Sequence, residues 1–113
     1  MAKVTTLEQY RIYLEAVDEE AQQTSQDEYA DLLSPGEVID LLVIRDEISR
    51  EDLSPEEQQE LERLDDLLIK HYRLVTGNIP PEPRKPRSQW WWHLHAGPQV
   101  RQKALALRGK EVP

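Results

Sequence analysis

The motif Ser-Pro-x-Glu occurs twice in this chain, as "SPGE" at residues 34–37 and as "SPEE" at residues 54–57. Each copy is typical of a helix start. The serine caps free backbone N–H groups, the proline presets φ at the first helical position, and the glutamate completes a capping box. Only "REDL" separates the end of the first predicted helix from the second motif. Because this link is so short, the sequence predicts an antiparallel helical hairpin.

Apolar residues follow both motifs at helical spacing. The helix after Ser34 has one face made of Val38, Leu41, Leu42, Arg45 and Ile48, and Ile39, Val43 and Ile44 widen that face. A helix that is apolar on most sides is expected to be central, with neighbours on two flanks. The stripe of the helix after Ser54 consists of Leu61, Leu64, Leu68, Tyr72 and Val75. Gly77 is the expected stop of that helix.

An N-terminal helix is predicted from Thr6 to about Gln23, with Thr6 as its N-cap. Its apolar stripe is made of Leu7, Tyr10, Leu14, Val17 and Ala21, which step by three and four. After a polar loop, "DEYADLL" at residues 27–33 is expected to add one further helical turn.

The chain changes character after Asn78. The segment "IPPEPRKP" has four prolines in eight residues and is expected to be extended. Three tryptophans follow at residues 90–92. A short helix is then predicted to start at Pro98, to present Val100, Ala104 and Leu107 on one side, and to end at Gly109. We therefore expect an acidic helical domain at 1–77, and a Pro-rich linker, Trp segment and basic C-terminal helix at 78–113. The fold class is all-α: a small bundle with a central antiparallel helical hairpin and a Trp-bearing C-terminal arm.

Charge is divided unevenly along the chain. Residues 1–80 hold 20 acidic and 7 basic side chains, whereas residues 81–113 hold 2 acidic and 7 basic ones. The acidic body disfavours direct nucleic-acid binding, because phosphates repel it. The sequence has no cysteine, no apolar leader, and no apolar run longer than "LLVI" at 41–44. We therefore expect a cytoplasmic protein with no disulfide and no membrane span.

The segment "QWWWHLH" at residues 89–95 is the main candidate site. An extended chain would point Trp90 and Trp92 one way and Trp91 and His93 the other, and a helix would spread the rings over about 200°. Neither conformation is expected to let one flat face hide all three rings. One interpretation is that one or two rings complete the core of the bundle. Another is a partner-binding surface made of Arg84, Lys85, Arg87, Trp90, Trp91, Trp92 and His93. A third is stacking on single-stranded nucleic acid.

No catalytic motif occurs in the sequence, and His93 and His95 lack a third metal ligand nearby, so we expect no enzyme activity, no metal and no cofactor. The predicted function is a protein-interaction or adaptor module that uses the acidic body and the basic Trp-rich arm. Its partner would be another protein or a second copy of the chain, with the apolar second helix as a further candidate dimer surface. The alternative is a regulator linked to nucleic acid, either an acidic antagonist of a DNA-binding protein or a single-strand binder.

Overall fold

The computed structural model describes residues 5–29 and 31–111; for Gln26, Asp27 and residues 106–111 it describes the backbone alone. These residues form helices and connecting turns, with no strand among them, so the predicted all-α class is confirmed. The α-helices are α1 (Thr6–Gln23), α2 (Gln26–Tyr29), α3 (Pro35–Ser49), α4 (Pro55–Lys70), α5 (Tyr72–Thr76) and α6 (Val100–Glu111). Two 3₁₀ turns, η1 (Trp90–Trp92) and η2 (Leu94–Ala96), precede α6.

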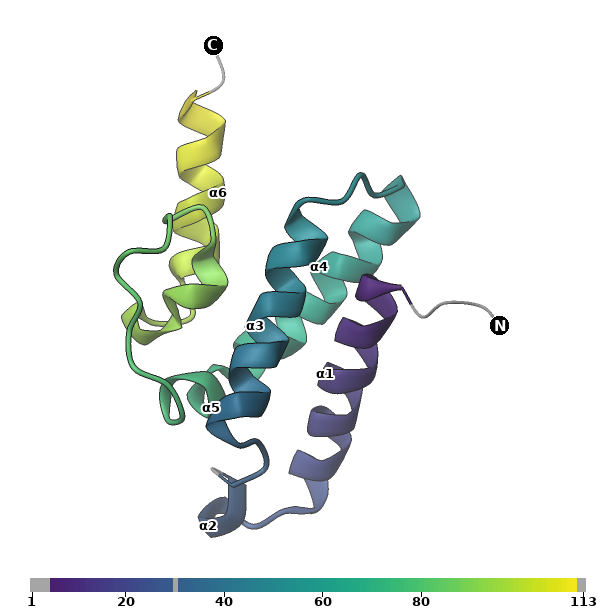
Figure 1. Ribbon diagram of the computed structural model, residues 1–113, viewed down its shortest axis with the longest axis vertical. Helices are drawn as coiled ribbons and strands as arrows, with labels where there is room; N and C mark the ends of the chain where they lie inside the picture. The colour runs from purple at the N-terminus through teal and green to yellow at the C-terminus, as the bar shows by residue number, and fades with distance from the viewer. Residues whose placement is uncertain (1–4, 30, 112–113) are drawn as a thin grey trace.

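The three long helices α1, α3 and α4 form the body of the molecule (Figure 1). Both capping boxes are present as predicted. The Ser34 and Ser54 hydroxyls each accept from the backbone N–H of the glutamate three residues later at 3.2 Å. The glutamate carboxylates in turn accept from the serine N–H groups at 3.0 Å. The α3–α4 hairpin therefore has two defined starts, and α1 packs against both of its helices.

Helix α1 has the predicted bounds, but its N-cap is Thr5 rather than Thr6. The Thr5 hydroxyl accepts from the N–H of Glu8 at 3.1 Å, which places Thr6 in the first turn. The prediction was one residue late because either threonine fits the N-cap pattern. The N–H that is capped belongs to Glu8, and Thr5 is the threonine three residues before it. Part of the extra turn predicted over residues 27–33 is present as α2 (Gln26–Tyr29), whereas residues 31–33 form a turn and bends rather than a helix.

The helix predicted to run from Ser54 to Gly77 is interrupted at His71. Helix α4 ends at Lys70, His71 has φ −107° and ψ 26°, and α5 begins at Tyr72. The His71 side chain is buried, so the chain turns here to place the ring inside. The turn also directs Leu74 and Val75 into the core while Tyr72 is only half-buried, contrary to its predicted place in the core.

The C-terminal segment returns to the body through the 3₁₀ turns. Gly97 turns the chain, and its φ of 112° favours glycine. Helix α6 begins at Val100, two residues after the predicted start at Pro98, and it continues through Gly109 to Glu111, so the predicted stop was wrong. Val100 and Ala104 are buried, whereas the side chain of Leu107 lies outside the described residues.

The predicted core is otherwise confirmed, and the C-terminal segment extends it. The additional buried residues are Leu33, Leu74, Ile79, Trp90, Trp91, Trp92, Leu94, Val100 and Ala104. Helix α3 is central as expected, with α1 on one flank and α5 and η1 on the other. Ile39 and Val43 nevertheless stay exposed. No helix in the described part of the chain is both long enough and apolar enough to cross a membrane.

Candidate functional site

A buried ion pair joins the two helices of the hairpin. Arg45 of α3 donates from Nε and Nη2 to the two carboxylate oxygens of Asp65 of α4, at 2.9 and 3.1 Å. Tyr10 of α1 donates its hydroxyl hydrogen to Asp65 Oδ1 at 2.7 Å. Burial holds the pKa of Tyr10 well above its usual value, so its hydroxyl remains a donor. The three side chains form one satisfied polar network in an otherwise apolar core.

The tryptophan segment covers this network from the side opposite α1. The Trp91 ring lies 4.2 Å from the Arg45 guanidinium carbon, and Trp90 meets Trp91 edge-on at a centroid distance of 5.6 Å. Asp46 accepts the indole N–H groups of Trp91 and Trp92 at 2.6 and 2.8 Å. One carboxylate on α3 therefore holds two of the three indoles in place.

All three rings are buried, with exposed fractions of 4, 3 and 6%. The prediction that no single flat face could hide all three rings stands, because groups from several parts of the chain cover them. The interpretation that only one or two rings complete the core was wrong, since all three do. The 3₁₀ turn places the rings against cations from three parts of the chain. Arg45 lies over Trp90 and Trp91, Arg101 of α6 also lies over Trp90, and Lys85 of the linker lies over Trp92. The rings thus join the body, the linker and α6 into one core.

The structure brings together five of the seven residues predicted to bind a partner: the three tryptophans lie together, and Lys85 and His93 join them. The Lys85 ammonium lies 4.6 Å from the Trp92 ring centroid, and the Lys85 carbonyl accepts from Nε2 of His93 at 2.8 Å. Arg84 and Arg87 are exposed on the linker, away from this cluster. The role of these residues in partner binding stays a prediction. Stacking on nucleic-acid bases requires exposed ring faces, and little of the faces of these buried rings is exposed.

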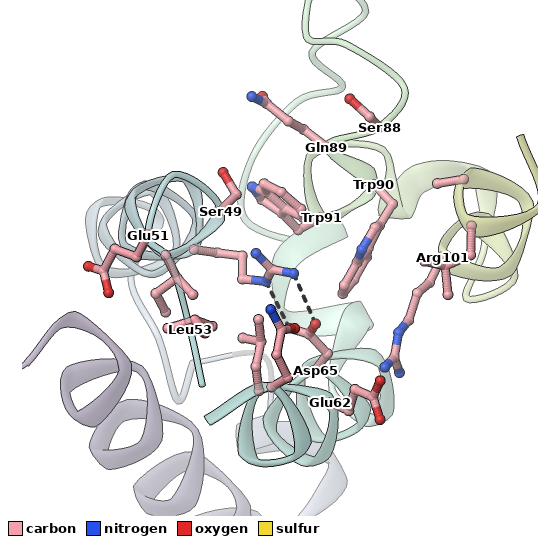
Figure 2. Close-up of a pocket in the computed structure, with 16 residues that line it drawn as sticks. Ser49, Glu51, Leu53, Glu62, Asp65, Ser88, Gln89, Trp90, Trp91 and Arg101 are labelled. Atoms are coloured by element: carbon pink, nitrogen blue, oxygen red, sulfur yellow. Dashed lines mark hydrogen bonds and ion pairs between the residues drawn. The ribbon is translucent and has the colours of Figure 1, made fainter. Parts of the chain in front are cut away.

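A groove opens beside the buried network, between the hairpin and the C-terminal segment (Figure 2). We call it the C-terminal groove. Its volume is about 380 Å³. Arg45, Asp65, Trp90 and Trp91 line it alongside other residues from α3, α4, η1, α6 and the connecting segments. The complete lining is Arg45, Ile48, Ser49, Glu51, Leu53, Gln58, Leu61, Glu62, Asp65, Ser88, Gln89, Trp90, Trp91, Arg101, Ala104 and Leu105.

The groove combines apolar side chains with acidic ones. Leu105 of α6 has an exposed fraction of 52%, and Leu53 opposite it is half-buried. Glu51 and Glu62 are exposed, and within the part of the chain that the structure describes no ion pair neutralises either carboxylate. Arg101 is engaged by Asp66 and Arg45 by Asp65. The groove therefore offers uncovered leucine surface next to unpaired negative charge.

The sequence predictions missed the residues that build this groove. Arg45 was placed on the apolar face of its helix. Asp65 comes directly after Leu64, which belongs to the apolar stripe of α4. A charged residue of each sign on facing apolar stripes is a signal of a buried pair, since a lone buried charge is costly. Nothing in the sequence pattern marked Asp46 as the acceptor for two indoles, or Leu105 as part of a groove.

A second polar cluster lies at the His71 turn. His71 Nε2 donates to Asp18 at 2.9 Å, and a hydrogen bond of 2.7 Å joins His71 Nδ1 to the Tyr29 hydroxyl. Hydrogen bonds from Lys70 and His71 lower the pKa of Asp18, and burial raises the pKa of Tyr29. The phenol is therefore not activated as a nucleophile. The cluster ties α2 to α1 and to the α4–α5 turn.

His93 and His95 bind backbone carbonyls rather than a metal. His95 Nε2 donates to the carbonyl of Ile79 at 2.8 Å, as His93 does to Lys85. Among the described residues, no group of three or more His, Asp or Glu side chains is arranged to hold a metal ion. Comparisons of the chain with protein-family models, with curated proteins and with solved structures gave no match.

Proposed function

We propose that this protein is a non-enzymatic protein-interaction module that binds a segment of a partner protein in the C-terminal groove. The observation that carries the proposal is that the exposed Leu105 and the unpaired Glu51 and Glu62 line the same groove as buried tryptophan and arginine side chains. Tryptophan and arginine are enriched among the residues that dominate binding energy at interfaces. A segment with apolar side chains and at least one basic residue fits this lining best.

The lining favours a protein segment over a small molecule. The volume of about 380 Å³ lies at the lower end of the range of ligand pockets. Such pockets usually direct a few unpaired polar groups at the ligand. Here the buried polar groups, Arg45 and Asp65, already satisfy each other. The rest of the lining mixes apolar side chains with serine, glutamine, glutamate and arginine side chains, which suits a protein segment that carries both apolar and polar residues.

We also propose a cytoplasmic location for the module. The chain has no cysteine, and a protein that needs no disulfide is suited to a reducing compartment. Its folding instead relies on the helical core and the satisfied Arg45–Asp65 network.

A photo-crosslinking amino acid at position 105 tests the proposal in living cells. We expect it to give a discrete crosslinked product, because Leu105 lies in the groove. The matched control is the same amino acid at Ile12, which is equally exposed, at 57%, but lies on α1 away from the groove. The product formed from position 105 should disappear when Glu51 and Glu62 are both changed to Lys.

If position 105 gave no product beyond that seen from position 12, the groove would not be a binding surface and the proposal would be wrong. Mass spectrometry of the product identifies the partner, including a second copy of this chain.

A further inference from the structure

We propose that the C-terminal groove receives helix α6 of a second copy, so that the protein forms a symmetric dimer. This inference rests on the proposed function and names the partner. It assigns a reciprocal role to α6, which borders the groove in its own molecule and fills the groove of its partner.

Helix α6 is incompletely packed at Leu105 within one copy. Figure 1 shows the helix running away from the body towards the C-terminus. Its first turns rest on η1 through Val100 and Ala104, but Leu105 is exposed and the helix continues to Glu111. Helices of about 12 residues are marginal in water unless one face is packed. Within one copy, the described residues therefore leave the apolar surface of Leu105 half uncovered.

The end of the hairpin and helix α6 carry opposite charges. The end of the hairpin, residues 46–62, holds eight acidic side chains and one basic one. Helix α6 holds four basic residues, at positions 101, 103, 108 and 110, and one acidic residue. Within one copy, the ion pair between α6 and the body joins Arg101 to Asp66, so Glu51 and Glu62 stay without a cation in the described residues. A second α6 would bring basic residues and a leucine to the same groove.

Two copies can fill each other's groove at the same time. A groove bounded by the hairpin and α6 of one copy can hold α6 of the other, and the reverse contact follows by two-fold symmetry. The partner's α6 then lies between the hairpin and α6 of the first copy. The first copy's α6 likewise lies between the hairpin and α6 of the partner. Leu105 of each copy lies near the axis. In such an isologous interface both copies use the same surface, so assembly stops at the dimer.

Sedimentation velocity of the full chain over a range of concentrations tests this inference first. We expect a species of twice 13.2 kDa that dissociates on dilution. Leu105→Asp should weaken the dimer by at least about tenfold, because it places a charge where apolar surface is buried. Ile12→Asp is the matched control on α1, and Val43→Asp probes the exposed apolar patch of α3; both should leave the dimer unchanged.

A charge-swap experiment tests the pairing itself. One variant carries Glu51→Lys and Glu62→Lys, and the other carries Lys103→Glu and Arg108→Glu. Each variant alone should be a weaker dimer, since its side chains at positions 51 and 62 then have the same sign as those at positions 103 and 108. Mixing them should restore association as a heterodimer, because positions 51 and 62 of each copy then meet side chains of opposite charge at positions 103 and 108 of the other.

A chain that is monomeric at every concentration overturns the inference. So does a dimer broken by Val43→Asp but not by Leu105→Asp, or a charge-swap mixture that does not associate. These failures are distinguishable from failure of the proposed function. In the first case, a crosslink from position 105 to a different protein leaves the groove as a binding surface, whereas the absence of any such crosslink removes both proposals.

Discussion

Asp65→Ala is expected to destabilise the protein by about 3–5 kcal/mol, because it leaves a buried arginine without its counter-charge. Asp65 accepts two hydrogen bonds from Arg45 and one from Tyr10, and all three side chains are buried. A domain of this size has a total stability of about 5–15 kcal/mol. Urea unfolding followed by circular dichroism should therefore show a large loss of stability, or an unfolded chain at 25 °C.

The neighbouring carboxylate provides the matched control. Asp66 is exposed and pairs with Arg101 at the surface, so Asp66→Ala should cost no more than about 1 kcal/mol. The triple variant Tyr10→Phe, Arg45→Met and Asp65→Leu removes every member of the network together and should recover most of the stability. An Asp65→Ala variant as stable as Asp66→Ala would contradict the buried network.

Trp91→Ala is expected to cost about 3–5 kcal/mol, the range for removing a large buried aromatic side chain. The substitution removes the ring that covers Arg45, its edge contact with Trp90 and its hydrogen bond to Asp46. Trp91→Phe keeps much of the ring, and Asp46 still accepts from Trp92, so this variant should lose much less. Unfolding in urea measures both losses.

Arg87→Ala, four residues earlier on the exposed linker, serves as the surface control and should change stability by no more than about 0.5 kcal/mol. If Trp91→Ala behaved like Arg87→Ala, the tryptophan segment would not be part of the folded core. Equal losses for Trp91→Ala and Trp91→Phe would instead show that the hydrogen bond to Asp46 outweighs ring packing.

The helices could be predicted because their signals are local. A serine, a proline and a glutamate within four residues determine where α3 and α4 begin, and apolar spacing determines which faces are buried. The turn at His71 could not be predicted in this way. The apolar stripe continues through Tyr72 and Val75, and the cause of the break is contact of His71 with Asp18 and Tyr29, which are 53 and 42 residues away.

The groove depends on longer-range contacts. The sequence showed that the tryptophans are unusual and that core completion was one explanation for them, but it could not say which neighbours cover them. Those neighbours are Arg45, Lys85 and Arg101, from three separate parts of the chain. Asp46 resembles any solvated helix carboxylate in the sequence, yet it lies 45 residues from the indole it holds.

The most direct test of this account is tryptophan fluorescence of the purified chain with acrylamide quenching, at several protein concentrations. The three tryptophans lie in residues 90–92, so the whole signal comes from one segment. The account predicts blue-shifted emission that is protected from quenching at every concentration, because the rings form the core of a single copy and the floor of the C-terminal groove. Red-shifted, freely quenched emission, or protection that arises only as concentration increases, would contradict it.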